Sequence, residues 1–326
     1  MTVKPEWPRP VDGTMTPRFA GPATFMRLPV MADASGLDIA IFGIPFDGGT
    51  TNRPGTRHGP RQLRDASGMM RRVHPISLTE PYTLCRVGDL GDLQTNPIDV
   101  MQTIDMVTEQ VAAIRRAGAW TLAAGGDHLL SLPLLRGIIQ GEPALAPLGM
   151  VHFDAHSDTN DTYFGGSRFT HGTPFRRAIE EGLLDPRRIV QIGIRGSLYD
   201  AHDMDWARQA GIRIMTIEEC ELLGPDAVAA EARRVIGTGA AYLTFDIDSI
   251  DPAFAPGTGT PEVGGFTPRE AMRILRGLSG LNLVGADLVE VSPPFDPSGG
   301  TALVGATMMF EILCLLAETR ARLRPR

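Results

Sequence analysis

Residues 148–158 read LGMVHFDAHSD, an apolar run followed by alternating acidic and imidazole side chains. The run at 148–153 has the composition of a strand buried on both faces. Every second side chain of an extended chain points the same way, so Asp154, His156 and Asp158 are directed at one point. Unpaired buried charge is costly, and metal coordination is the simplest reason to place these groups there.

A second segment repeats this pattern later in the chain. Residues 241–248 read AYLTFDID, so that Asp246 and Asp248 also follow an apolar run. His128 ends a third, glycine-rich element, GGDH at 125–128. A single Asp at a strand end is more often a helix cap, and a single His is more often a satisfied semi-buried side chain. Caps and turns have no cause to repeat the alternation, so the three segments together predict a metal site.

The number of candidate ligands favours two ions over one. One divalent ion does not need six protein ligands, whereas two ions that share carboxylates do. Imidazole and carboxylate ligands without cysteine suit Mn²⁺, and also Fe, Co, Ni or Zn. Two such ions, about 3.5–4 Å apart, lower the pKa of bridging water and supply hydroxide, which is hydrolytic chemistry. The predicted ligands are His128, Asp154, His156, Asp158, Asp246 and Asp248.

Strand-like and helix-like stretches alternate from residue 37 onward, which predicts an α/β fold with three α-β-α layers and a mainly parallel sheet. We expect a single catalytic domain over residues 37–326, preceded by an N-terminal arm at 1–36 that is rich in Pro, Gly and Met. The expected strands are 37–44, 120–124, 148–153, 188–194, 212–216, 241–245 and 281–288. The expected helices are 61–73, 100–117, 130–139, 174–181, 224–236, 267–278 and one through 309–316.

The composition of the chain limits which partners and which cellular compartment are expected. The formal net charge of −7 gives no electrostatic argument for nucleic acid or an anionic membrane surface, and neither partner is expected. Three widely spaced cysteines form no CxxC pair and predict free buried thiols in a reducing compartment. The N-terminus lacks the apolar core of a secretory signal, and no stretch is expected to span a membrane. We therefore expect a cytoplasmic protein.

Three motifs resemble the ureohydrolase family of arginases and agmatinases. They are GGDH (125–128), HFDAHSDT (152–159) and FDIDSIDPAFAPGTGTPEVGG (245–265), and HGTPFRRA (171–178) and VEVSPPFD (289–296) also fit. The similarity extends from near Pro17 to the end of the chain. The resemblance implies an arginase-like fold, two Mn²⁺ ions or another divalent metal such as Ni²⁺, and release of urea from a small guanidino substrate. It also implies a homo-oligomer, either a trimer or a hexamer.

The family resemblance also implies a role for each ligand. His128 and Asp158 would hold the first ion, His156 and Asp248 the second, and Asp154 and Asp246 would bridge the two. Asp158, His171 and Glu290 are the expected catalytic residues. His171 resembles the family's proton-transfer histidine, although a loop histidine can also simply cap a turn. Glu290 resembles the carboxylate that receives the guanidinium, for which a carboxylate is the planar bidentate partner; its alternative is a salt bridge to a core Arg.

The segment after Asp158 is expected to choose the substrate. Residues 160–170 differ from the arginase loop and resemble the guanidino-acid branch, as does PRFAGPATFMRLP at 17–29. In that branch the residue at the position of Tyr163 helps to set the preferred length of the substrate, although packing is an equal alternative for this tyrosine. A tyrosine at this position would shorten the pocket and offer a hydroxyl to a carboxylate. It therefore favours 3-guanidinopropionate as the substrate, then 4-guanidinobutanoate, then agmatine, while guanidine or biguanide-type compounds stay open. The expected substrate-binding residues are Asn160, Tyr163, His171 and Glu290. Arg168 and Arg195 are candidate partners for a substrate carboxylate. The glycine-rich segment 45–60 is expected to form the cavity rim, from which Arg53 or His58 reaches the substrate or a neighbouring subunit.

Two other functions compete with a guanidino hydrolase. One is a different di-metal hydrolase of the same fold, such as a formiminoglutamate or deacetylase-like enzyme, which would release formamide or ammonia in place of urea. The other is a catalytically weak regulatory subunit of an active partner. The intact set of six ligand types argues against the second.

Overall fold

A single sheet of eight strands forms the centre of the computed structural model, which describes Trp7 and residues 9–324. The strand order is β2-β1-β3-β8-β7-β4-β5-β6, and every neighbouring pair is parallel. The prediction of a mainly parallel sheet is confirmed. The strands are β1 (Ile39–Gly43), β2 (Val87–Asp92), β3 (Trp120–Ala124), β4 (Leu148–Phe153), β5 (Leu184–Ile194), β6 (Arg213–Thr216), β7 (Ala240–Asp246) and β8 (Asn282–Val289).

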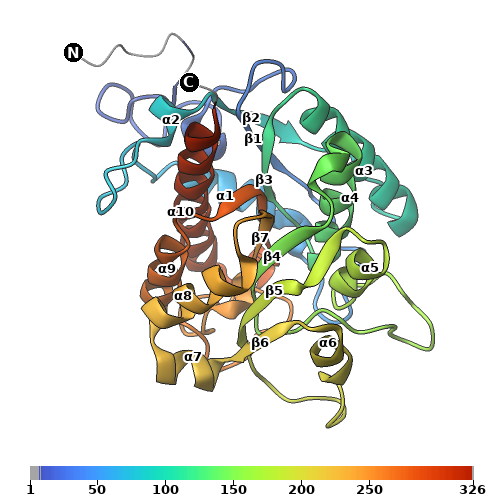
Figure 1. The fold of residues 1–326 in the computed structure, drawn as a ribbon. Helices are drawn as coiled ribbons and strands as arrows, with labels where there is room; N and C mark the ends of the chain where they lie inside the picture. Colours follow the sequence, from blue (N-terminus) through green and yellow to red (C-terminus); the bar gives the residue numbers. More distant parts are fainter. Residues whose placement is uncertain (1–6, 8, 325–326) are drawn as a thin grey trace.

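Helices cover both faces of the sheet and give the three expected layers (Figure 1). One face carries α3 (Val100–Arg116), α4 (Ser131–Gly141) and α5 (Pro174–Glu180), which pack on one another. The other face carries α1 (Gly59–Ser67), α7 (Ile217–Leu223), α8 (Pro225–Ile236), α9 (Pro268–Gly277) and α10 (Gly300–Leu323). The short α2 (Pro81–Leu84) contacts α10, and α6 (Asp205–Ala210) contacts β5.

Local chemistry sets the helix boundaries. Asp99 caps α3 by accepting a hydrogen bond from the Gln102 N–H. Thr267 and Glu270 form a reciprocal capping box at the start of α9, and Pro268 is the first residue of the helix. The central strands β3 and β4 are buried at every position, which explains their continuous apolar sequence.

Two sequence expectations need correction at the helices. The helix expected over 61–73 ends at Ser67, because the chain turns at Gly68. No membrane-length stretch was expected, yet α10 is long and apolar enough by length and composition. Most of its apolar stretch is buried, and α10 packs against β8, α1 and α9. The apolar sequence of α10 therefore reflects its place in the core.

The N-terminal segment packs on the body of its own chain. Phe25 is fully buried, and its N–H donates to Asp89 Oδ2 of β2 at 2.8 Å. Met31 N–H donates to the Asp89 carbonyl at 2.8 Å, and Val30 forms an isolated bridge with Asp89. Residues 1–6 and 8 of the expected arm lie outside the described residues. The division at residue 36 stays a prediction.

Gly126 lies where three chain segments meet at the end of β3. A Cβ at this position would be 1.6 Å from the carbonyl oxygen of Phe46. The neighbouring Asp127 N–H donates to that same oxygen at 3.0 Å, and the Gly126 carbonyl accepts from Glu290 N–H at 2.8 Å. This contact therefore positions both His128 and Glu290, and it admits no side chain.

We expect the substitution Gly126→Ala to lower the free energy of unfolding by about 1–3 kcal/mol or more, since the methyl group overlaps a backbone atom that cannot move alone. Urea unfolding followed by circular dichroism measures this. Gly300→Ala is the matched control, because a Cβ there meets its nearest atoms at 3.5 and 3.6 Å. Equal stability of both variants would show that the close approach at Gly126 is not a constraint.

Candidate metal centre

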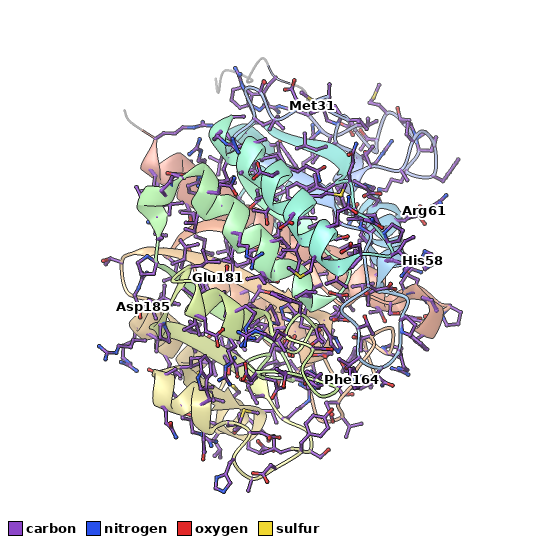
Figure 2. The ribbon with its side chains drawn as sticks, turned by 90° about the vertical axis from the view of Figure 1, so that its right-hand side faces the viewer. Met31, His58, Arg61, Phe164, Glu181 and Asp185 are labelled. Carbon is purple, nitrogen blue, oxygen red and sulfur yellow. The ribbon has the colours of Figure 1, made fainter. Side chains whose placement is uncertain are left out.

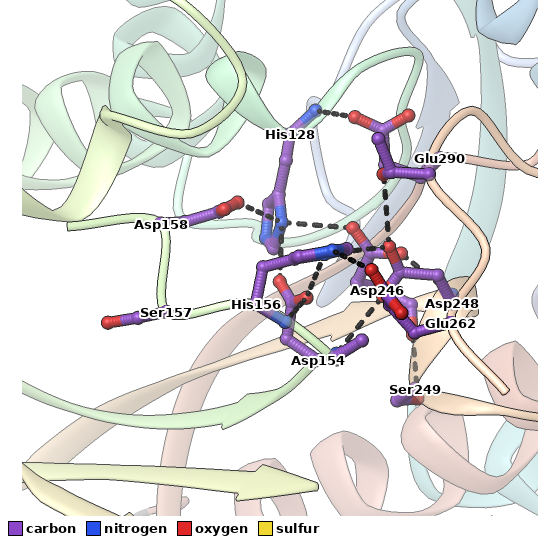
Figure 3. Close-up of polar contacts among 12 residues, drawn as sticks. His128, Asp154, His156, Ser157, Asp158, Asp246, Asp248, Ser249, Glu262 and Glu290 are labelled. Carbon is purple, nitrogen blue, oxygen red and sulfur yellow. Dashed lines mark hydrogen bonds and ion pairs between the residues drawn. The ribbon is translucent and has the colours of Figure 1, made fainter. Parts of the chain in front are cut away.

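The six predicted ligands come together at the carboxyl ends of adjacent central strands (Figure 3). His128 opens a 3₁₀ turn shortly after β3, Asp154 follows β4 directly, and Asp246 ends β7. These strands belong to the central group β3-β8-β7-β4, and Glu290 follows β8 directly. Ligands of open parallel sheets bind at this edge. The sheet thus converts residues far apart in sequence into one cluster.

Four side chains converge on a first point. His128 Nδ1 lies 2.9 Å from Asp158 Oδ2 and 3.1 Å from both Asp154 Oδ2 and Asp246 Oδ2. All four residues are buried. The His128 Nε2 atom is 2.9 Å from Thr244 Oγ1, whereas Nδ1 has no hydrogen-bond partner among the described residues. The buried Nδ1 atom and the three carboxylate oxygens that face it form a set of ligand atoms that suits a cation.

Three side chains converge on a second point beside the first. His156 Nδ1 lies 3.1 Å from Asp248 Oδ2 and 3.3 Å from Asp154 Oδ1. Asp154 thus directs Oδ2 to the first group and Oδ1 to the second, the arrangement of a bridging carboxylate. Asp246 joins the first group through Oδ2, while its Oδ1 accepts the Asp248 N–H at 2.8 Å. A bridging role for Asp246 stays a prediction.

The electrostatics of the cluster fit divalent cations. Burial raises the pKa of Asp246 well above its usual value, and the nearby Asp248 and Asp154 carboxylates raise it further. Burial and Asp154 likewise raise the pKa of Asp248. Carboxylates packed this closely repel one another unless positive charge lies between them. With imidazole and carboxylate ligands only, the cluster has the composition of a binuclear divalent-metal site.

Two site residues have an unusual backbone. The φ angles of Asp158 and Glu290 are +52° and +65°, in the left-handed region that non-glycine residues rarely adopt. Such conformations persist where the surrounding structure determines them, and they cluster at functional sites. Both residues are among those predicted to be catalytic.

Glu290 and His171 form a pair next to the cluster. Glu290 Oε1 accepts from His128 N–H and from His171 Nδ1, both at 2.9 Å. Glu290 Oε2 is buried and has no partner within the described chain. Burial lowers the pKa of His171, but the neighbouring Glu290 outweighs it and raises the pKa to about 9. A pKa of about 9 leaves both ring nitrogens protonated near neutral pH, and the Thr51 Oγ1 atom, 2.7 Å from Nε2, can accept the hydrogen there.

A cavity of about 520 Å³ opens onto the cluster. Its lining includes the predicted residues His156, Asp158, Asn160, Tyr163 and His171. Asn160 Nδ2 donates to Tyr163 Oη at 2.7 Å, so the Tyr163 hydroxyl hydrogen can point elsewhere. The structure therefore brings Tyr163 to the cavity.

Neither arginine expected to bind a substrate carboxylate is available for it. Arg168 does not line the cavity and donates to Glu180 at 2.8 Å on the surface. Arg195 lines the cavity, but each of its three guanidinium nitrogens donates to backbone carbonyls. One of these carbonyls belongs to Gly193 near the end of β5 and the others follow β7, and sequence spacing alone could not show that they occupy the side chain.

The rim differs in part from expectation. Arg53 lines the cavity, with Nη2 donating to the Thr258 carbonyl at 2.7 Å. His58 is exposed, does not line the cavity, and lies beside Arg61 at the edge of the molecule (Figure 2). Phe164, at the tip of the loop after Asp158, is 76% exposed and lies on the surface in the same view.

The sequence did not reveal several partners of the cluster. His152 is fully buried, with Nε2 2.7 Å from Asp154 Oδ2, although it stands only two residues before the first predicted ligand. Thr51, beside His171, and Thr244, beside His128, are uncharged and carry no motif. The alternation that singled out Asp154 extends back to His152, and that was the one available signal.

Comparisons with known proteins agree with this geometry. Residues 37–315 match the arginase family model. Over 315 residues the chain is 59% identical to guanidinopropionase of Pseudomonas aeruginosa, covering 97% of this chain and 98% of the relative. It is 46% identical to guanidinobutyrase of the same organism, covering 94% and 96%. The solved structure of proclavaminate amidino hydrolase from Streptomyces clavuligerus superposes with a TM-score of 0.88 at 40% identity, covering 93% and 100%.

The fold and the cluster define a ureohydrolase-type metal hydrolase, one that cleaves C–N bonds of linear amidines. The chain belongs to the arginase family, in its guanidino-acid branch.

We expect Asp154→Asn to lower the content of both ions, because the two Asp154 oxygens face different groups of ligands. His156→Asn should chiefly remove the second ion. Metal analysis of dialysed protein by mass spectrometry measures both. Asp203→Asn is the control, since Asp203 lines the same cavity but belongs to neither group. Loss of a single ion from Asp154→Asn would contradict the bridging geometry.

Proposed function

We propose that this protein is a binuclear amidinohydrolase that converts a small linear guanidino acid and water into urea and the corresponding amine. The observation that carries the proposal is the buried Glu290 Oε2 atom, which has no donor among the described residues and lies beside an assembled cluster of ligands. A guanidinium group supplies the missing N–H donors in the plane of a carboxylate.

We propose that the centre takes two Mn²⁺ ions, with Ni²⁺ or another divalent ion as the alternative. His128 and Asp158 would hold one ion, His156 and Asp248 the other, with Asp154 and Asp246 shared. The absence of thiolate ligands supports a metal of this kind. Bound divalent ions lower the pKa of water and so supply hydroxide near neutral pH.

The protein's own groups then orient the substrate and move a proton. Glu290 binds the guanidinium and so holds its carbon against the cluster. Asp158 directs its carboxylate at the first group of ligands, beside His128. His171 Nε2, which faces Thr51 Oγ1 at 2.7 Å, carries a proton near neutral pH and delivers it to the departing amine nitrogen. The bond that breaks joins the guanidino carbon to the nitrogen that carries the substrate's alkyl group, and a C–O bond to the water oxygen replaces it. A guanidinium and a water thus become an ammonium and urea.

We propose 3-guanidinopropionate as the substrate, with 4-guanidinobutanoate second. Tyr163 lines the cavity and would shorten it for the substrate, and its hydroxyl, held through its oxygen by Asn160, can donate to a carboxylate. The similarity to guanidinopropionase supports the same order. Agmatine is the third choice, because its distal group is cationic and Tyr163 offers it no negative charge.

We further propose that the protein acts in the cytoplasm as a homotrimer or homohexamer. The three cysteines are free and buried, which supports a reducing compartment. The family resemblance supports the assembly.

Urea release from a panel of guanidino compounds tests the function. With Mn²⁺ loaded, we expect kcat/KM to be highest for 3-guanidinopropionate, lower for 4-guanidinobutanoate and lowest for agmatine, arginine and guanidine. The bound metal is quantified in the same preparation. A fully loaded protein that released no urea from any compound would refute the proposal, and formamide or ammonia as product would indicate the related hydrolases.

The variant Glu290→Gln sharpens this test. Loss of the charged partner should lower kcat/KM on the order of 100-fold, because breaking a buried charge pair costs about 2–5 kcal/mol. Glu180→Gln, a surface carboxylate paired with Arg168, serves as the control. Unchanged activity of Glu290→Gln at full metal content would exclude Glu290 as the guanidinium partner.

A further inference from the structure

His152 is a buried histidine whose role the cluster itself leaves open. It lies in β4, is fully buried, and packs against Phe175 with ring centroids 4.5 Å apart. Its ligand-type atom lies within 4.8 Å of those of His128, Asp154 and Asp158. By position, His152 can therefore either hold an ion itself or donate a hydrogen bond to a residue that does. The two roles require opposite states of Nε2.

Gln191 distinguishes these roles. Its amide nitrogen is identified by the Ser157 carbonyl oxygen at 2.6 Å, since only an N–H can face that acceptor. The amide oxygen faces the Ser157 hydroxyl at 3.1 Å, which fits the same orientation. The amide nitrogen also lies 3.3 Å from His152 Nδ1. Its second N–H is thus directed at the ring, and Nδ1 must accept it.

The protonation of His152 follows from this contact. A neutral imidazole has one lone pair, and here Nδ1 uses it to accept from Gln191. Nε2 therefore carries the hydrogen and donates it to Asp154 Oδ2 at 2.7 Å. No lone pair remains for an ion.

We propose that His152 is a positioning residue for the metal centre, locked by Gln191 in the tautomer that donates Nε2–H to Asp154. The contact holds the carboxylate so that Oδ2 faces His128 while Oδ1 faces His156. It also withdraws charge from a carboxylate whose two oxygens face both groups. This inference rests on the proposed metal centre, but not on which guanidino compound is hydrolysed.

A pair of variants separates a donor at Nε2 from general packing. Glutamine places its amide N–H near the position of Nε2, whereas asparagine reaches only to that of Nδ1. We expect His152→Asn to weaken Mn²⁺ binding about 10–100-fold, the effect of losing a hydrogen-bond partner of a ligand, and His152→Gln to restore most of it. Competition with a chelator measures the affinity without any substrate.

His74 provides the matched control. It is also buried, its Nδ1 accepts the Ser77 N–H, and its Nε2 faces Glu311 at 3.0 Å, all within residues that take no part in the cluster. His74→Asn and His74→Gln should leave Mn²⁺ affinity unchanged. Equal affinities of His152→Asn and His152→Gln, or a similar loss from the His74 variants, would overturn the proposal.

The tautomer can be observed in the unaltered protein. Solid-state NMR of protein labelled with ¹⁵N in the histidine rings distinguishes a protonated from an unprotonated nitrogen, and the His152→Gln variant assigns the signal. We expect Nε2 of His152 to carry its hydrogen in the metal-free protein and in a diamagnetic Zn²⁺-loaded one. A hydrogen on Nδ1 or a metal-shifted Nε2 would refute the inference. Absence of urea release alongside the expected tautomer would instead refute only the proposed function.

Discussion

The mutual repulsion of carboxylates buried at one edge of the sheet is the constraint on which the site depends. Asp154, Asp246 and Asp248 are almost completely removed from solvent and lie beside one another. Burial and their proximity make the charged state of Asp246 and Asp248 costly. Histidine rings and backbone N–H groups reduce that cost only in part. Divalent cations offset it, and the same cations provide hydrolytic chemistry.

The parallel sheet makes this concentration of charge possible. Its central strands bring residues from four distant parts of the sequence to one edge, and the core behind them is apolar. Gly126 allows the chain after β3 to pass against Phe46, which places His128 within reach of Glu290. The left-handed backbone of Asp158 and Glu290 is a local cost that the surrounding packing offsets. A few backbone contacts of the fold thus position the residues of the site.

Much of the centre was predictable because its signals are local. The alternation at 154–158 and 246–248 singled out the ligands, although the expected extended chain was wrong: β4 ends at Phe153, Asp158 has a left-handed backbone, and Asp248 lies in a 3₁₀ turn. Strands β3 and β4 were placed to the residue by their apolar runs. The strand β2, with the sequence VGDLGD, was missed because it lies at the sheet edge and carries polar residues. The helices α2, α6 and α7 were also missed.

The roles that depend on distant partners were not predictable. Arg195 has the charge to bind a substrate carboxylate, but backbone carbonyls from other elements occupy it. His152 reads as a further candidate ligand until Gln191, thirty-nine positions away along the chain, fixes its tautomer. A hydrogen-bond partner of this kind has no spacing rule. Only the three-dimensional arrangement assigns such groups.

The position of the ions in a crystal loaded with Mn²⁺ tests the centre most directly. Anomalous scattering at the manganese edge should give two peaks, one beside His128 and Asp158 and one beside His156 and Asp248, with Asp154 contacting both. A single peak, or a peak that makes no contact with Asp154, would contradict a two-ion centre organised around that carboxylate.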